Sequence, residues 1–307
     1  MRTHVRDSKK NVSEEGVLQG EKLQKVMAQC GFGSRRMMEQ WIANGRVKVN
    51  GEPATLGMRV YEGDLIKADR RVFCVGQKHN AVRVLLYHKP EGEIVSRNDP
   101  EKRASVFDKL PKARGQRWIA IGRLDFNTSG LLIFTTSGEL ANSLMHPRFG
   151  VEREYAVRTQ GSMTEMQMAM LLDKGIELED GVVKFDLLQD EGGEGFNHWY
   201  RAILKEGRNR VVRRTFEALG LPVSRLIRVR FGTINLPPRL KRGMTIELKE
   251  GEVAHLLQWA GLVDERIGSP GKLLESCKTG LIQPEKNDHY PDAMGKDAKS
   301  KQTKRKK

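Results

Sequence analysis

The sequence is poor in the residues and runs that mark disulfide-rich, metal-binding or membrane proteins. Its three cysteines, Cys30, Cys74 and Cys277, are widely spaced and form no C-x-x-C pair. We therefore expect no disulfide framework and no metal site, and we interpret the cysteines as small apolar residues in a reducing compartment. The apolar runs, such as that from Val84 to Tyr87, fall far short of the ~20 residues that span a bilayer.

Acidic residues are outnumbered by basic ones. The 307 residues include 54 Lys+Arg against 39 Asp+Glu, which gives a formal net charge of +15 at pH 7. This balance favours a polyanionic partner, nucleic acid or an anionic membrane surface, over a surface that is merely well solvated. The N-terminus lacks the apolar segment of a secretion signal, so we expect a cytoplasmic protein with a nucleic-acid partner and no membrane association.

Composition along the chain predicts four segments. Residues 1–20 form a polar, basic tail, residues 21–79 a first compact unit, residues 80–262 a second unit, and residues 263–307 another polar, basic tail. Blocks of like charge do not bury a core, so both tails are expected to be disordered. Two roles for the tails stay open, as arms that touch nucleic acid and as solubilising extensions.

Residues 21–79 show two helical patterns followed by a strand pattern. Apolar residues recur at helical spacing from Leu23 to Cys30, and Ser34 is placed to cap a second helix. Apolar and basic residues then alternate from Arg46 to Val49, and Asn50-Gly51 signals a tight turn. The unit is predicted to be two short helices leading into a small sheet.

Basic residues at the start of the second helix are unfavourable for helix stability. Arg35 and Arg36 occupy its first turn, where cations oppose the helix dipole. Beside free backbone N–H groups the two arginines instead suit a phosphate, and Arg46 and Lys48 follow closely in sequence. We favour an RNA-phosphate site over the alternative that these side chains are simply solvated.

Residues 80–262 mix strands with a few helices. Strand patterns cover residues 82–85, 131–134, 155–157 and 226–230, and amphipathic helices are predicted from Met163 to Asp173 and from Val211 to Leu219. No regular β-α-β alternation is present, so the fold class is predicted to be α+β with a mixed, mostly antiparallel sheet.

The stretch from Gly122 to Thr135 carries the strongest chemical signal. Two glycines, Gly122 and Gly130, bracket a polar loop that contains Arg123 and Asp125 and leads into an apolar strand. Catalytic residues often lie on loops held by rigid strands. Taken alone, however, Asp125 also suits an ordinary turn.

Four segments in register resemble the ribosomal RNA pseudouridine synthases that carry an N-terminal S4 domain, a family with small-subunit and large-subunit members. Gly122 to Leu132 matches the family's signature loop, and residues 21–67 resemble its S4 RNA-binding domain. His146 to Tyr155 resembles the segment with the active-site tyrosine, and Glu206 to Arg214 the basic motif. The resemblance spans residues 21–262 and implies an S4 domain followed by a pseudouridine synthase catalytic domain.

The resemblance assigns three catalytic residues. Asp125 is implied to be the carboxylate beside the ribose, Tyr155 to stack on the uracil, and Arg213 to be the cationic partner of Asp125. The alternatives are a solvated helix arginine for Arg213 and an ordinary strand tyrosine for Tyr155. The reaction needs no redox step, so no cofactor and no metal are expected.

The resemblance also implies RNA contacts. Arg123 is expected to fill the gap left by a flipped base, with a phosphate clamp or a structural ion pair as alternatives. Arg208, Arg210 and Arg214 are expected to bind along the RNA backbone. Two positions of the basic motif depart from the family pattern, Val211 and Thr215, which puts local packing in doubt.

Residues 97–100, 117–120 and 224–230 resemble the large-subunit members of the family. The implied partner is 23S rRNA, with a target uridine in domain V near the peptidyl-transferase centre, or an assembly intermediate of the large ribosomal subunit. A monomer is expected. Two alternatives stay open, the same chemistry on another rRNA or tRNA uridine and a non-catalytic S4-type ribosome-assembly factor.

Overall fold

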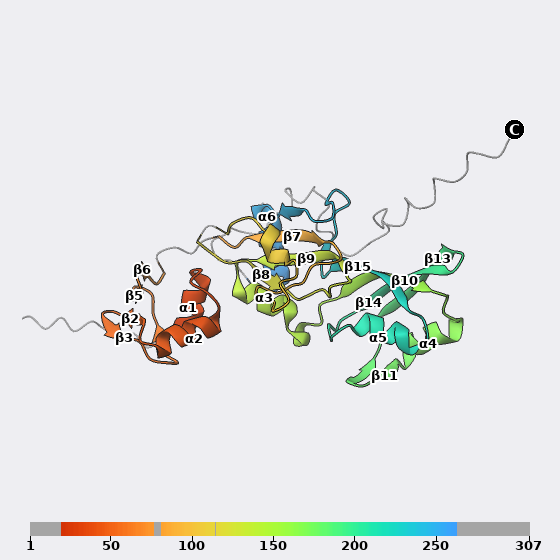
Figure 1. The fold of residues 1–307 in the computed structure, drawn as a ribbon, viewed down its shortest axis with the longest axis horizontal. Helices are drawn as coiled ribbons and strands as arrows, with labels where there is room; N and C mark the ends of the chain where they lie inside the picture. Colours follow the sequence, from red (N-terminus) through yellow and green to blue (C-terminus); the bar gives the residue numbers. More distant parts are fainter. Residues whose placement is uncertain (1–19, 77–80, 114, 263–307) are drawn as a thin grey trace, which may run out of the picture. The chain divides into compact units, whose positions relative to one another are not determined.

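The computed structural model describes residues 20–76, 81–113 and 115–262, which divide into two compact units between Asn80 and Ala81 (Figure 1). The two predicted tails lie outside the described residues, apart from Gly20. No helix within the described ranges is long and apolar enough to cross a membrane.

Unit 1 consists of two short helices and short strands. The elements are β1 (Glu21–Lys22), α1 (Leu23–Gln29), α2 (Arg35–Ala43), β2 (Val47–Val49), β3 (Glu52–Pro53), β4 (Arg59–Val60), β5 (Leu65–Ala68) and β6 (Arg71–Cys74). Four strands form a sheet in the order β3-β2-β5-β6, and β1 pairs with β4. The Ser34 hydroxyl accepts from the Met37 amide and caps α2, as the sequence predicts. Leu23, Met27, Met38 and Ile66 are among the fully buried core residues.

Unit 2 is built on one long mixed sheet in the order β13-β14-β10-β15-β9-β7-β17. Its strands are β7 (Val84–Lys89), β8 (Ile119–Ile121), β9 (Ser129–Thr135), β10 (Arg153–Gln160), β13 (Leu187–Glu194), β14 (Asn197–Leu204), β15 (Val223–Phe231), β16 (Ile234–Asn235) and β17 (Thr245–Glu247). Only the β9–β15 pair is parallel among the described strand pairs of this sheet. The predicted fold class, α+β with a mostly antiparallel sheet, is confirmed.

Helices and a separate hairpin cover this sheet. They are η1 (Val106–Lys109), α3 (Gly138–Met145), η2 (Pro147–Phe149), α4 (Glu165–Asp173), α5 (Val211–Ala218) and α6 (Glu250–Trp259), with the hairpin β11 (Ile176–Leu178) and β12 (Gly181–Val183). The predicted helices at 163–173 and 211–219 correspond closely to α4 and α5. Figure 1 shows α4 and α5 on the same side of the β10 and β14 strands.

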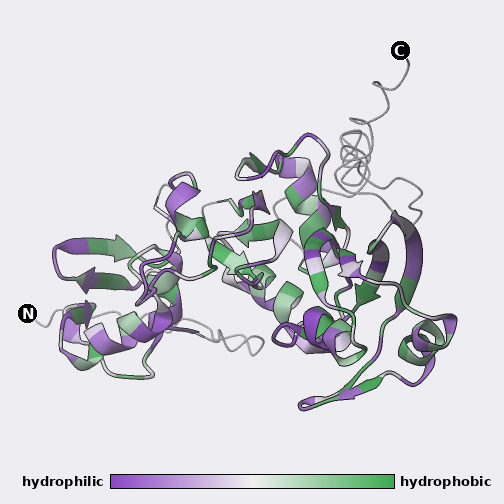
Figure 2. Cartoon of the chain, turned by 45° about the vertical axis from the view of Figure 1, so that its right-hand side comes forward, coloured by the Kyte–Doolittle hydropathy of each residue, from purple (hydrophilic) through white to green (hydrophobic). Residues whose placement is uncertain are grey.

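The core of unit 2 is divided among the two faces of the sheet. On the β7–β9 half, one face packs with α3 and α6, and the other packs around Trp118 and Phe134. On the β10–β14 half, Tyr155, Tyr200 and Phe216 belong to a core that includes α5. The central strands are accordingly the mostly green, hydrophobic part of the molecule in Figure 2. The parallel β9–β15 pair joins the two halves and positions the site described next.

Candidate active site

A cleft of about 1320 Å³ opens in unit 2. Its walls come from the loop between β8 and β9, from β10 and β15, and from the loop between β14 and α5. Five residues predicted from the sequence line this cleft: Arg123, Asp125, Tyr155, Arg208 and Arg210. The fold therefore brings together the signature loop, the tyrosine segment and the basic motif.

Asp125 lies on the segment that joins β8 to the start of β9, which we call the catalytic loop (residues 122–130) after the role predicted for Asp125. Gly130 ends this loop with a φ of 108°, and a Cβ there would lie 2.3 Å from the carbonyl oxygen of Arg228 on β15. Glycine is therefore required by both conformation and space. Within the loop, the Thr128 amide donates to the Asp125 carbonyl at 3.0 Å. This turn leaves the Asp125 side chain only partly buried, at the cleft.

Two cationic side chains hold three consecutive carbonyls of the catalytic loop. The Lys89 Nζ donates to the Thr128 carbonyl at 2.8 Å and, at 3.4 Å, to the Phe126 carbonyl. The Arg213 Nη2 donates to the Asn127 carbonyl at 2.7 Å. Lys89 has 0% exposure and Arg213 has 6%. Because hydrogen bonds from charged donors are strong where water is excluded, these contacts fix the backbone beside Asp125.

Asp125 interacts electrostatically with both cations without pairing directly with either. Burial lowers the pKa of Lys89 to about 8, and attraction to Glu93 and then to Asp125 opposes that shift. Burial likewise lowers the pKa of Arg213, whereas Asp125 raises it. Among the described residues, the Asp125 carboxylate makes no ion pair or side-chain hydrogen bond. Arg213, predicted as the cationic partner of Asp125, interacts with it electrostatically and donates its hydrogen bonds to the Asn127 and Val223 carbonyls.

Tyr155 faces the same cleft from β10. It is 8% exposed and belongs to the core that α5 covers. In the sheet it lies between Ala202 on β14 and Arg228 on β15. The phenol ring is thus held on both sides by strands, on the same face of the sheet as the cleft.

Lys89 was missed by reasoning from the sequence. It ends β7, in the run VLLYHK, and a lysine at the end of an apolar strand ordinarily marks the point where a strand leaves the core. Its burial follows from the catalytic loop, which crosses the end of β7 and supplies the carbonyl acceptors. A signal that could have pointed to it is the Lys89-Pro90 pair, which closely follows the apolar run from Val84 to Tyr87.

Comparisons with known proteins agree with this geometry. Residues 83–218 match the family model described as RNA pseudouridylate synthase, and residues 21–66 match the S4 domain. A Salmonella typhi protein named ribosomal large subunit pseudouridine synthase B is 54% identical over 247 residues, which cover 80% of this chain and 84% of that protein. The chain belongs to the RNA pseudouridylate synthase family. The resemblance inferred from the four sequence segments is confirmed.

Other relatives carry the same name. The Yersinia pestis protein is 55% identical over 75% of this chain and 73% of its own length. The Pseudomonas aeruginosa protein is 54% identical over 82% of this chain, and the match spans 65% of that longer protein. A crystal structure of a pseudouridylate synthase has the same fold, with a TM-score of 0.53 and 23% identity over 77% of this chain and 99% of that one.

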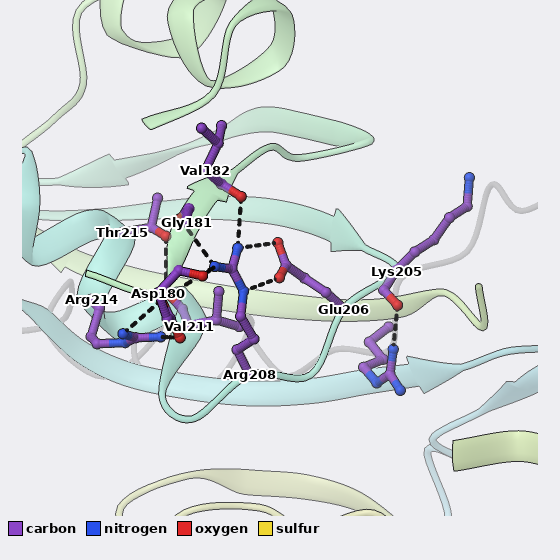
Figure 3. Close-up of polar contacts among 10 residues, drawn as sticks. Asp180, Gly181, Val182, Lys205, Glu206, Arg208, Val211, Arg214 and Thr215 are labelled. Carbon is purple, nitrogen blue, oxygen red and sulfur yellow. Dashed lines mark hydrogen bonds and ion pairs between the residues drawn. The ribbon is translucent and has the colours of Figure 1, made fainter. Parts of the chain in front are cut away.

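In this synthase, the basic motif is engaged with a hairpin of the protein itself (Figure 3). Arg208 donates to both Glu206 oxygens, to the Val182 carbonyl at 2.7 Å and to the Asp180 carbonyl at 2.7 Å. Arg214 forms two bonds to the Asp180 carboxylate, at 2.7 and 3.0 Å. We call Asp180, Glu206, Arg208 and Arg214 the clasp, because they fasten the β11–β12 hairpin to the start of α5. The RNA contacts predicted for Arg208 and Arg214 stay predictions.

Electrostatics reinforce the clasp from both sides. Hydrogen bonding to Arg214 lowers the pKa of Asp180, and hydrogen bonding to Glu206 raises the pKa of Arg208.

The two residues that depart from the family pattern, Val211 and Thr215, both fit the local packing. Val211 is buried in the core, and the buried Thr215 hydroxyl donates to the Val211 carbonyl at 2.9 Å.

The remaining predicted RNA contacts in unit 2 are more exposed. Arg123 is exposed at the cleft, and its guanidinium has no side-chain partner among the residues that the structure describes. Arg210 precedes α5 with a φ of 47° and lies 3.4 Å from Glu217. The Phe126 side chain, beside Asp125, is 43% exposed and also lines the cleft. The cleft thus offers both cationic and aromatic surface to a ligand.

In the S4 domain the four predicted basic residues fall into two groups. Arg35 and Arg36 are exposed in the first turn of α2, and Lys48 is exposed on β2. Arg46 instead pairs with Asp69 through two hydrogen bonds and stacks over the Trp41 ring at 4.1 Å. The first three side chains are available to a ligand, whereas Arg46 is already engaged.

Proposed function

We propose that this synthase converts one uridine of 23S rRNA, in domain V near the peptidyl-transferase centre, into pseudouridine with Asp125 as its catalytic carboxylate. The names of the relatives specify the large ribosomal subunit. The observation that carries the chemical assignment is the placement of Asp125, a carboxylate that forms no ion pair with any described residue, in a cleft lined by cations. A site for RNA binding alone has no use for a carboxylate facing a polyanion.

The reaction isomerises the nucleotide without changing its composition. The bond between ribose C1′ and uracil N1 breaks, the base turns, and a bond forms between C1′ and C5. The proton on C5 is lost and N1 gains one. Asp125 supplies the carboxylate at the ribose, and the cations Lys89 and Arg213 fix its loop. Tyr155 lies against the uracil.

Binding of the RNA is shared between the two units. The target uridine must leave its helix, which costs a few kcal/mol, and Arg123 offsets part of this cost by entering the vacated space. Arg208, Arg210 and Arg214 add attraction to phosphates near the cleft. Arg35, Arg36 and Lys48, the predicted basic residues of residues 21–79 that are available to a ligand, bind RNA phosphates. Residues 80–262 perform catalysis.

The substrate is tested by mapping the product. The purified protein is incubated, without added cofactor, with a domain V fragment of 23S rRNA, with 16S rRNA and with tRNA, and pseudouridine is located by chemical labelling and primer extension. A single new stop in the domain V fragment is expected. A primer-extension stop found only in another RNA would show that the protein performs the same isomerisation on that RNA instead. Tight binding without product on these RNAs, total cellular RNA and assembly intermediates would favour a non-catalytic assembly factor.

The role of the S4 domain is tested by salt dependence. Replacing Arg35 and Arg36 by alanine is expected to weaken RNA binding and to reduce the slope of log K against log[salt] by roughly 1 for each phosphate that the protein no longer neutralises. A Lys67→Ala variant, also on the surface of this unit but outside the predicted contacts, is the control. An unchanged slope in the double variant would remove these arginines from the RNA interface.

A further inference from the structure

A β-bulge in β15 determines which side chain stands opposite Tyr155. Glu154 pairs with Arg230, but the register then shifts so that Tyr155 pairs with Arg228, and Val229 is the extra residue. An unbroken register would place Val229 opposite Tyr155. Directly opposed residues of an antiparallel pair point to the same face of the sheet. The bulge therefore brings a guanidinium, rather than an isopropyl group, to the cleft face beside the tyrosine.

Arg228 is deeply buried at this position. It is 2% exposed, lines the cleft, and donates from Nε to the Leu131 carbonyl at 2.8 Å. Its guanidinium interacts electrostatically with the Tyr155 side chain that it opposes in the sheet, and the Nη2 has no hydrogen-bond partner among the residues that the structure describes. A buried guanidinium that is not fully hydrogen-bonded is unfavourable for stability. A role at the reacting site explains this buried and incompletely hydrogen-bonded guanidinium better than a role in packing does.

The same residue connects Tyr155 to the catalytic loop. Arg228 pairs in parallel with Gly130, the last residue of that loop, and its side chain holds the next carbonyl along, that of Leu131. The backbone of Gly130 approaches Arg228 so closely that no side chain fits there. Tyr155 on β10 and Asp125 at the β8–β9 turn are therefore fixed relative to each other through one arginine.

We propose that Arg228 is a positioning residue for the isomerisation, which holds the Tyr155 hydroxyl in a fixed place against the uracil and fixes it relative to the Asp125 loop. This inference rests on the proposed function, since Tyr155 has a role only if the cleft receives a uridine. Arg153, the other cation that interacts electrostatically with Tyr155, is held by the carbonyls of Val151 and Lys205. Arg228 is distinguished from it by lying directly opposite Tyr155 in the sheet and by a guanidinium that is not fully hydrogen-bonded.

The first test compares two arginines of the same strand. Arg228→Met is expected to lower kcat by roughly 10- to 100-fold, while KM and the Kd for the domain V fragment stay within about twofold. Arg228→Lys, which retains the charge, is expected to recover part of the loss. Arg230→Met is the control, since Arg230 is also largely buried in β15 but pairs with Glu152 and Glu154 on the opposite face. Its kcat is expected to stay near that of the wild type.

The second test is a double-mutant cycle with Tyr155→Phe, which removes only the hydroxyl. If Arg228 acts through that hydroxyl, Arg228→Lys changes kcat by no more than about twofold in the Tyr155→Phe background. The cycle uses Arg228→Lys, so it remains informative even if Arg228→Met does not fold. Thermal unfolding of each variant shows whether it folds. Fully additive losses, or an Arg228→Lys kcat equal to that of the wild type, would overturn the proposal. Absence of product with the wild-type protein would instead refute the proposed function.

Discussion

Two loops of the catalytic unit face the same cleft and are held by different kinds of interaction. The catalytic loop is held by the buried cations Lys89 and Arg213, which donate to backbone carbonyls. The β11–β12 hairpin is held by the clasp, whose ion pairs are partly exposed, with Asp180 41% exposed in its pair with Arg214. Exposed ion pairs are weak and screened by salt, whereas buried charged hydrogen bonds are not.

The difference matches what each loop must do. Under the proposed function, Asp125 has to meet a ribose within a fraction of an ångström, so its loop gains from rigid, water-free contacts. The hairpin wall of the cleft would have to admit a large polyanion, and the clasp arginines that hold the hairpin are paired with carboxylates that phosphates can rival. This contrast predicts graded effects, greatest for substitution of Lys89 and least for substitution of Asp180.

The largest effect is expected from Lys89→Met. Loss of the ammonium frees the Phe126 and Thr128 carbonyls, and a small displacement of the catalytic loop is expected to lower kcat by roughly 100-fold or more. RNA binding should change little, because Lys89 is inaccessible to a ligand. Lys109→Met is the matched control, since Lys109 pairs with the neighbouring Glu93 but is exposed. A kcat for Lys89→Met within about threefold of the wild-type value would contradict the view that buried cations hold the catalytic loop in place for the reaction.

A change of pH is expected to have an intermediate effect. It acts on the catalytic loop at alkaline pH, through Lys89, and on the hairpin at acidic pH, through Asp180. The folded-state pKa of Lys89, about 8, lies below its ordinary value. The folded protein therefore binds fewer protons than the unfolded chain between these values, and the stability penalty for the buried charge is relieved as pH rises through this window. Activity should nevertheless fall above about pH 8, because the charge beside Asp125 is lost.

Asp180 acts at the acidic end of the scale, and there the folded state favours the charged form of the group. Its folded-state pKa is lowered, so its stabilising contribution is present above the unfolded value and is lost as pH falls through the folded one. Activity profiles and thermal unfolding across pH check both statements. An alkaline loss of activity that persists unchanged in Lys109→Met but disappears in a Lys89→Arg variant would assign that limb to Lys89. An alkaline limb shared equally by Lys89→Arg would contradict the assignment.

The smallest effect is expected from Asp180→Asn. The variant should lower the thermal unfolding midpoint by a few degrees at most, and the difference from the wild type should shrink in high salt. Backbone amides of β11 and β12 should exchange hydrogen faster, whereas those of the catalytic loop should not. Lys205 and Asp186, another exposed pair in this unit, supply Asp186→Asn as a control. Faster exchange at residues 125–130 would show that the two loops are not held independently.

Much of this architecture was predictable because it depends on local patterns. The Ser34 cap and the Asn50-Gly51 turn, with φ values of 53° and 94° at its two residues, follow from short-range rules. The catalytic loop was recognised from its glycine spacing and its resemblance to a known signature. Each of these features is encoded within about a dozen residues.

What was not predictable depends on long-range register. The acceptors of Lys89 lie 37 and 39 residues away, and Asp180 meets Arg214 across 34 residues. The position of Arg228 depends on a bulge, and a one-residue shift in register exchanges the faces of a strand. Arginines of the basic motif look alike in sequence, so the pattern does not separate those bound to the protein from those free for RNA.

The most direct test of the central claim is a comparison of Asp125→Asn with the wild type on the same 23S rRNA fragment. Single-turnover product formation and Kd are measured together, with Asp186→Asn as a carboxylate control that also lines the cleft. We predict that Asp125→Asn binds the fragment within about twofold of the wild-type Kd and forms no pseudouridine, because the amide keeps the shape of the side chain but lacks its charge. Product formation by Asp125→Asn at the wild-type rate would contradict the account.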